Sequence, residues 1–232
     1  MKKQPGRSRM KNGLQAYQAK RDFNQTREPA GTRPGPARKH RSLQFVVQKH
    51  DASHLHYDFR LEMNGVLKSW AVPKGIPLDK GEPRLAMEVE DHPLEYGRFE
   101  GVIPPGNYGA GTVQLWDRGK YEATDAAPAD ALRKGKLSFV LHGKKLNGHW
   151  TLVRTRREDG VRNSWLLIKT GENVPRQPTE EMERSVRSGK TLEELSHSRH
   201  VWKSSRKGGS AAAPTSFKAR IQRMVARKQH RA

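Results

Sequence analysis

The chain has 232 residues and no cysteine, which excludes disulfides and thiolate metal sites and fits a reducing compartment. Hydrophobic residues make up 33% and the mean hydropathy is −0.94, so part of the chain is too polar to pack into a core. No apolar run approaches the roughly 20 residues of a membrane span, and residues 1–6 lack the apolar stretch of a secretory signal. We therefore expect a cytoplasmic protein with no membrane segment, built as one domain with extensions.

The net charge of +21 is concentrated at the two ends of the chain. Residues 1–42 hold twelve Lys or Arg against Asp22 and Glu28, and residues 201–232 hold nine without any acid. The segment 43–200 holds 24 basic and 22 acidic residues and is close to neutral. Basic arms on a neutral domain are typical of proteins that follow a phosphate backbone, although such tails also serve solubility or bind other anionic surfaces. Composition therefore favours a nucleic-acid partner.

The N-terminal arm, residues 1–42, is rich in Gly, Pro, Lys and Arg. Its segment Leu14–Phe23 has the composition for one or two helical turns. The stretch Pro29–Pro36 forms a linker that fits neither a helix nor a central strand. On composition alone, the arm is therefore predicted to be disordered.

From residue 43 onward, short segments alternate polar and apolar residues, a pattern that predicts β-strands. The alternation is strictest in His56–Met63 and recurs in Arg84–Glu90. Further strand-like segments are Phe45–His50, Val66–Val72, Thr112–Trp116, Leu137–His142, Trp150–Arg154 and Trp165–Lys169. About eight short strands with little helix between them predict a mainly β fold, as an antiparallel barrel or sandwich with a few short helices and flexible basic termini.

Turn and helix signals separate these segments. The dipeptides Asn64-Gly65 and Asn147-Gly148 are typical of tight turns between strands. Pro128–Lys134 predicts a short helix, and the spacing in Thr191–Glu194 is that of a capping box. The tail at 201–232 places four apolar residues at helical spacing among Lys and Arg, which indicates either a disordered tail or a helix that folds on a partner or on DNA. These four are Phe217, Ile221, Met224 and Val225.

One predicted strand carries an unusual row of polar side chains. Because side chains alternate along a strand, His56, Asp58 and Arg60 share one face, opposite the aromatic residues between them. His50 ends the preceding strand, and the five intervening residues allow a reversal that brings it beside His56 and Asp58. Two imidazoles and a carboxylate suit a divalent transition metal, and an arginine fork beside it suits a phosphate. A solvated polar face is the alternative interpretation.

A second set of polar residues follows along the chain. Its cations lie near strand ends, and its other members are carboxylates and a histidine: Lys74, Arg84, Glu88, Glu90 and His92. We predict that Glu88, Glu90 and His92 share one face of a strand. The loop 103–111 is so rich in Gly and Pro that its backbone could approach a ligand closely, although a tight barrel corner explains it equally well. Together these residues predict a metal-dependent phosphate-processing site, with Arg60 and Lys74 neutralising the developing charge.

Four ungapped stretches carry a family resemblance: His50–Met63, Trp70–Gly75, Glu90–Gly97 and Phe99–Pro104. They closely resemble the 3′-phosphoesterase domain of bacterial DNA ligase D, and the resemblance extends from about Tyr17 to Ile168. It implies a β-barrel with a manganese-dependent site, although the N,N,O ligand set also accommodates zinc or cobalt. It further implies removal of a 3′-terminal ribonucleotide from a primer strand, and then of the remaining 3′-phosphate, in bacterial non-homologous end joining.

The resemblance also implies individual roles. The metal ligands fall on His50, His56 and Asp58, and Arg60 and His92 complete the catalytic set. His92 becomes either a transition-state donor or a general acid. The residues that contact phosphate or substrate fall on Arg21, Asp22, Glu28, Gln48, Lys74, Arg84, Glu90 and Tyr96. The first three of these lie in the arm, which is therefore expected to fold over the site when substrate is present.

The resulting organisation is an arm at 1–42 that contributes to the site, a phosphoesterase barrel at 43–200, and a basic, largely disordered tail at 201–232. In ligase D the module is joined to ligase and polymerase domains, and neither fits in 232 residues. We expect a stand-alone, monomeric, nucleoid-associated version that acts on primer–template 3′ ends, with a separate ligase or Ku as partners.

Other classes stay open. One is a metal-dependent phosphodiesterase that acts on RNA or on small phosphate esters, although a small ester gains nothing from extended cationic arms. Another is a non-catalytic DNA-end binding module that keeps the barrel. The sequence also leaves open whether water or a neighbouring 2′-hydroxyl is the attacking group.

Overall fold

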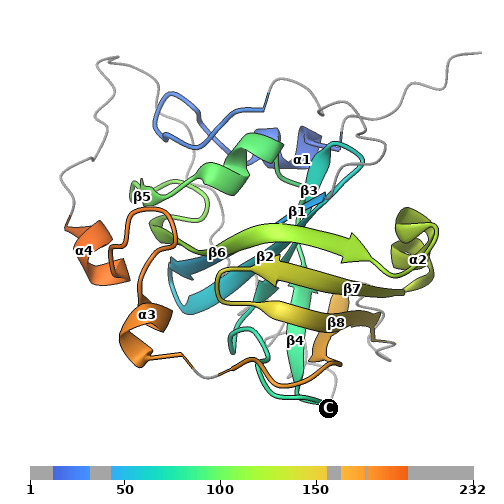
Figure 1. Cartoon of the computed structure of the whole chain (residues 1–232). Coiled ribbons are helices and arrows are strands. Elements are labelled where there is room, and N and C mark those ends of the chain that lie inside the picture. The colour runs from blue at the N-terminus through green and yellow to red at the C-terminus, as the bar shows by residue number, and fades with distance from the viewer. Residues whose placement is uncertain (1–12, 32–42, 156–162, 176, 198–232) are drawn as a thin grey trace, which may run out of the picture.

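The computed structural model describes residues 13–31, 43–155, 163–175 and 177–197. The strands in these ranges form a single sheet in the order β1-β2-β3-β4-β9-β8-β7-β6-β5, and β1 also pairs with β6. That extra pairing closes eight strands into an antiparallel barrel, with β5 added on the edge of β6 (Figure 1). The prediction of a mainly β barrel is confirmed, and the sandwich alternative is wrong.

The strands are β1 (Leu43–Asp51), β2 (Leu55–Met63), β3 (Val66–Val72), β4 (Pro83–Glu88), β5 (Gly101–Ile103), β6 (Gly111–Ala123), β7 (Lys136–Gly143), β8 (Asn147–Arg154) and β9 (Ser164–Lys169). The helices in the described ranges are α1 (Gln15–Ala19), α2 (Pro128–Lys134), α3 (Thr179–Glu183), α4 (Leu192–Ser196) and the 3-10 helix η1 (Leu94–Arg98). The predicted helix at Pro128–Lys134 and the capping box at Thr191 are confirmed. The predicted amphipathic segment near Phe217 lies outside the described residues.

Large apolar side chains fill the barrel interior. Phe59 and Leu61 of β2 point inward and are fully buried, as their alternation predicts. Phe59 stacks on Phe139 with ring centroids 5.7 Å apart. The same core contains three fully buried tryptophans, one each from β3, β8 and β9: Trp70, Trp150 and Trp165. This packing fixes which face of β2 points outward, because a one-residue slip in register would turn every side chain of the strand over.

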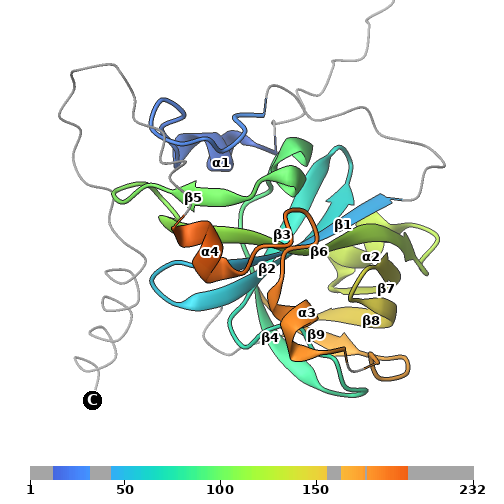
Figure 2. The same ribbon diagram turned by 60° about the vertical axis from the view of Figure 1, so that its left-hand side comes forward.

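The outward face of β1 and β2 is covered instead of solvated. A second apolar cluster packs on it, and its buried members are Tyr17, Leu67, Tyr96, Phe99, Ile103 and Val113. Figures 1 and 2 both show α1 and η1 over the same end of the barrel wall. Because both faces are covered, six consecutive residues of β2, from Asp58 to Met63, are buried. The solvated-face interpretation of this strand is therefore wrong.

The strand predicted to carry Glu88, Glu90 and His92 on one face ends earlier than expected. The pairing of β4 with β9 stops at Met87, and the chain then follows β3 alone. His92 exchanges backbone hydrogen bonds with Leu67 of β3 in an isolated bridge. Glu90 and His92 still meet at Arg21, whereas Glu88 accepts a hydrogen bond from Trp165 Nε1, so the predicted common face is wrong for Glu88.

Of the two predicted turns, only one has the expected form. Asn64 and Gly65 both have positive φ, 53° and 81°, which suits the turn between β2 and β3. Asn147 and Gly148, in contrast, already belong to the ladder of β7 with β8. The reversal lies at 144–146 because the buried carboxylate of Asp117 accepts hydrogen bonds from all three backbone N–H groups there. A side chain distant in sequence thus determines this turn.

In the described part of the chain, no helix is long and apolar enough to span a membrane.

We expect Asp117→Ala to lower the free energy of unfolding by about 2–4 kcal/mol, because it leaves buried backbone donors without an acceptor. Asp117→Asn, which keeps one acceptor oxygen, should lose less. Urea denaturation followed by tryptophan fluorescence measures both, with the exposed Glu122→Gln as a neutral control. If Asp117→Ala and Glu122→Gln were equally stable, the turn would not depend on this carboxylate.

Candidate active site

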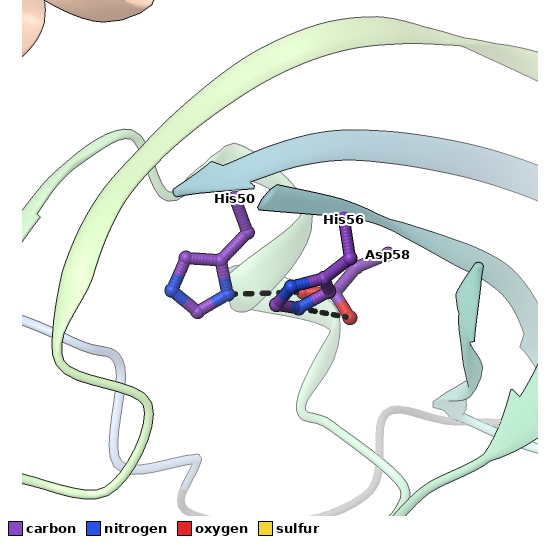
Figure 3. Close-up of side chains that lie close together, drawn as sticks. All are labelled: His50, His56 and Asp58. Atoms are coloured by element: carbon purple, nitrogen blue, oxygen red, sulfur yellow. Dashed lines mark ion pairs between the residues drawn. The ribbon is translucent and has the colours of Figure 1, made fainter. Parts of the chain in front are cut away.

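Three side chains converge where β1 and β2 are joined (Figure 3). His50 and His56 are direct cross-strand partners, and Asp58 follows His56 on the same face of β2. His50 Nδ1 lies 3.6 Å from Asp58 Oδ2, and His56 Nε2 lies 3.9 Å from Asp58 Oδ1. One ligand atom from each residue lies within 4.8 Å of the others. The predicted reversal after His50 thus brings together two nitrogens and one oxygen around a point that a single divalent ion fits.

The remaining nitrogen of each imidazole is bound by a backbone carbonyl. His50 Nε2 donates to the Gly109 carbonyl and His56 Nδ1 donates to the His54 carbonyl, both at 2.9 Å. Since a carbonyl only accepts, the second nitrogen of each ring, which faces Asp58, is the one left to bind a metal ion. Such outer hydrogen bonds orient metal-binding histidines and fix their tautomers. The residues present therefore fit a metal ion by tautomer as well as by ligand type, and the loop 103–111 approaches the site with its backbone.

Asp58 shares its carboxylate with a buried arginine. Arg60 Nη2 donates to Asp58 Oδ2 at 3.0 Å, and Arg60 Nε donates to Gln48 Oε1 at 2.9 Å. The Gln48 amide is itself fixed, since it donates to the carbonyls of Tyr96 and Phe99. Burial opposes ionisation of Asp58, but Arg60 and the two neighbouring histidines outweigh it and hold the pKa of that carboxyl well below its usual range. Asp58 is therefore ionised at neutral pH, as a metal ligand must be.

One nitrogen of the Arg60 guanidinium is left for a ligand. Arg60 is 2% exposed, and its Nη1 makes no hydrogen bond within the described ranges. A buried donor without a partner costs about 1–3 kcal/mol, which an incoming acceptor recovers. The guanidinium lies over the Tyr96 ring, with Cζ 4.9 Å from the centroid. A rigid, unsatisfied arginine fork beside Asp58 suits a phosphoryl oxygen.

Arg21 attaches the arm to this region. Its Nε donates to Glu28 Oε1 at 2.9 Å and its Nη1 donates to Glu90 Oε1 at 3.2 Å, and all three side chains are at most 5% exposed. The guanidinium also stacks on the Tyr17 ring at 3.9 Å. Burial opposes the charge on Arg21, but Glu28 together with Tyr96 and Tyr17 outweighs it and raises the pKa of Arg21 above its ordinary value. Residues 13–31 are thus packed over the site, and the composition-based expectation of disorder is wrong for this part of the arm.

His92 lies between the arm and the barrel wall. Its Nδ1 donates to the Glu90 carbonyl at 2.9 Å, and its Nε2 accepts from Arg21 Nη2 at 3.3 Å. Burial lowers the pKa of His92 well below its usual value, and the charges of Arg60 and Arg21 lower it further. The ring is therefore neutral, and in this arrangement it receives a hydrogen bond from Arg21 and offers no proton toward the metal ligands.

Ten of the predicted site residues form two groups of polar contacts, one around Arg21 and one around Arg60, which meet where the rings of His92 and Tyr96 lie 4.7 Å apart. They are Arg21, Glu28, Glu90 and His92 in the first group, and Gln48, His50, His56, Asp58, Arg60 and Tyr96 in the second. Three others lie outside these groups. Asp22 is exposed and accepts hydrogen bonds from neighbouring residues of its own turn. Lys74 is exposed just beyond β3. Arg84 lies on the same face of β4 as Ala86, whose side chain is part of the barrel core, and it forms an ion pair with Glu82.

The structure adds residues that the sequence did not indicate. Lys20 Nζ donates to Glu90 Oε2 at 2.9 Å and lies 4.7 Å from the centroid of the Tyr108 ring. Tyr108 is 37% exposed and precedes Gly109, whose carbonyl holds His50. The only sequence signal for Tyr108 was an aromatic residue inside a loop of Gly and Pro.

Comparison with known proteins settles the family of this domain. A family model described as the DNA Ligase D 3′-phosphoesterase domain matches residues 48–154, which include the triad of candidate metal ligands His50, His56 and Asp58. The domain belongs to the DNA ligase D 3′-phosphoesterase family. This confirms the resemblance drawn from the sequence motifs.

The relatives of this phosphoesterase domain are much longer proteins. A multifunctional non-homologous end joining protein LigD of Pseudomonas aeruginosa is 54% identical over 165 residues, or 70% of this chain and 19% of the relative. A LigD of Mycobacterium tuberculosis, named a multifunctional non-homologous end joining DNA repair protein, is 44% identical over 142 residues, 61% of this chain and 18% of the relative. The chain thus spans about a fifth of the length of these relatives.

We expect His56→Ala and Asp58→Ala to weaken Mn²⁺ binding at least ~100-fold, because each removes a ligand from the triad. His54→Ala is the matched control, since this exposed neighbour contributes only its backbone carbonyl. Isothermal titration calorimetry with MnCl₂ measures all four proteins. Mn²⁺ affinity of Asp58→Ala equal to that of the wild type would place the ion elsewhere.

We expect Arg21→Gln to raise the pKa of His92, because it removes a nearby positive charge and opens the cover over the ring. An NMR titration of the His92 ring protons, assigned with His92→Asn, measures the shift. Asp22→Asn, next to Arg21 but without contact to His92, should leave the titration unchanged. An unchanged His92 titration in Arg21→Gln would contradict this arrangement.

Proposed function

We propose that the chain is a manganese-dependent phosphoesterase that processes DNA 3′ ends. It removes a 3′-terminal ribonucleotide or a 3′-phosphate from a primer strand. The observation that supports this most is the unsatisfied Nη1 of buried Arg60 beside the triad of His50, His56 and Asp58. An anion-binding donor and a metal-ligand set meet there, which is what phosphate-ester hydrolysis requires. Membership of the phosphoesterase family supports the same reaction class.

The protein's own residues bind and orient the phosphate. Arg60 donates from Nη1 to a phosphoryl oxygen while its other nitrogens stay on Asp58 and Gln48, so the fork does not rotate as charge develops. Glu28 and Glu90 hold Arg21 over the site. His50, His56 and Asp58 would hold a divalent ion, which would supply Lewis-acid polarisation of the phosphoryl group and activation of the attacking water or 2′-hydroxyl. Manganese rests on the family resemblance, since zinc and cobalt also suit an N,N,O set.

Fewer structural observations support the roles of the other predicted residues. For His92 to donate to the substrate, Arg21 has to leave its Nε2, so we assign proton donation by His92 to an arrangement in which the arm has moved. Lys74 is exposed beyond β3 and is proposed to contact substrate at the rim. Substrate contacts by Asp22 and Arg84 rest on the resemblance alone.

DNA is favoured as substrate by charge. Basic segments at both ends of a near-neutral domain add binding energy to a polynucleotide and none to a small phosphate ester. The relatives are named for non-homologous end joining, and we propose the same pathway here, at the bacterial nucleoid, with a separate ligase or Ku as partner.

We expect Arg60→Lys to lower turnover about 10²- to 10³-fold, because the charge remains but the planar fork is lost, while Mn²⁺ affinity changes little. The assay uses 5′-labelled primer–templates that end in a ribonucleotide, a 3′-phosphate or a 3′-hydroxyl, each with and without MnCl₂. His54→Ala serves as the matched control. The proposal would be contradicted if the wild-type protein bound these DNA ends but converted none of them with manganese, zinc or cobalt. The domain would then be a non-catalytic end-binding module.

A further inference from the structure

A second, cationic groove lies apart from the triad. It has a volume of about 750 Å³ and is bordered by the arm, by η1 and β5, and by the stretch that joins α3 to α4. Four cations from these three segments line it: Arg27, Arg98, Arg187 and Lys190. Two carboxylates, Glu95 and Glu100, also border it, so the lining carries an excess of positive charge.

The four cations are not neutralised by the protein. All are exposed, and within the described ranges none lies within ion-pair distance of a carboxylate. Glu100 is already engaged, since its Oε2 accepts from the Leu115 backbone N–H and from the Ser185 hydroxyl. Four unpaired cations against two carboxylates leave an excess of positive charge in the groove, which favours binding of an anionic ligand.

The C-terminal wall of the groove is held firmly on the barrel. The Val186 N–H donates to the Leu115 carbonyl of β6, and the Gln114 side chain donates to the carbonyls of Glu183 and Lys190. Arg187 donates through Nη1 to the Arg98 carbonyl and so joins this wall to η1. Figure 2 shows the α3–α4 stretch lying against β6 and below β5. The cations of this wall are therefore presented from a backbone that is already ordered, which reduces the entropy lost on binding.

One layer of residues separates the groove from the active site. Glu28 is buried against Arg21, while the preceding residue, Arg27, lines the groove. Phe99 also lines the groove, and its carbonyl accepts from Gln48, the residue that orients Arg60. A ligand that binds both in the groove and at the triad must therefore be an extended polyanion that passes this layer of residues.

We propose that this groove binds the phosphate backbone of the DNA duplex whose 3′ end lies at the triad. The proposal rests on the proposed function and adds to it the path of the substrate. Three arginine forks and a lysine suit phosphates, which charge complementarity favours over an apolar partner. The contacts are to backbone alone, so binding here carries no sequence preference.

The test is a triple variant, Arg27→Gln, Arg98→Gln and Lys190→Gln, in the full chain. These side chains make no hydrogen bond or ion pair within the described residues, and Arg187 is kept because it joins two walls. The matched control removes three exposed cations from β6, α2 and β7: Lys120→Gln, Lys134→Gln and Lys136→Gln. Figure 1 shows α2 on the side of the barrel opposite α4 and β5, which border the groove. Thermal unfolding checks that all three proteins are equally stable.

Fluorescence anisotropy measures binding of a blunt DNA duplex and of a polyglutamate peptide across a salt series. Because the groove variant lacks three cations that each neutralise a phosphate, its slope of log Kd against log salt should fall by about 2.7, and duplex binding should weaken roughly tenfold or more. The control variant should keep the slope of the wild type. Because the experiment measures DNA binding, its result on the groove does not depend on whether the wild-type protein hydrolyses 3′ ends.

Two results would overturn the proposal. One is an equal slope for duplex in the groove and control variants. The other is loss of polyglutamate binding in the groove variant with duplex binding unchanged, which would make an acidic protein segment the occupant.

Discussion

The buried ion pair between Asp58 and Arg60 constrains the rest of this domain. Both residues sit on the outward face of a barrel strand, yet they are 8% and 2% exposed. Burying such a pair is costly unless its remaining donors and acceptors are satisfied. The arm, η1 and β5 cover the wall and bury the pair. Gln48 satisfies Arg60 Nε and is itself fixed by main-chain carbonyls, while Arg60 Nη1 is left for a ligand.

The barrel positions the triad through strand register. His50 and His56 are opposite each other because the interior packing of Phe59 and Leu61 fixes how β1 pairs with β2. A bulge in β6 leaves Trp116 without a partner on β1, between the pairs formed by Val47 and Gln48. Beyond it, the first part of β6 pairs with β5, and the loop between them returns the Gly109 carbonyl to His50. Bulges commonly re-aim chains beside functional sites in this way.

Much of this arrangement follows from alternation in the sequence. The limits of β2 and β3, the inward aromatic residues and the convergence of His50, His56 and Asp58 all come from a period of two and one reversal. Alternation does not encode the packing of the arm and η1 over the outward face of the barrel. Tyr17 and Tyr96 are in contact there although they are 79 positions apart and belong to no common alternating segment. The arm looked disordered by composition because its ordering depends on ion pairs with a distant partner, such as Arg21 with Glu90. The facing of Arg84 on β4 and the role of Asp117 in the turn at 144–146 likewise depend on contacts between strands that form only in the folded sheet.

The central claim is that Arg60 and the triad bind one metal-associated phosphate together. A crystal structure of the protein with Mn²⁺ and inorganic phosphate, with anomalous data collected at the manganese edge, tests this most directly. We expect one anomalous peak bound by His50 Nδ1, His56 Nε2 and Asp58, and a phosphate oxygen within hydrogen-bond distance of Arg60 Nη1. An anomalous peak away from these three ligands, or a phosphate bound elsewhere with Arg60 Nη1 still unpaired, would contradict it.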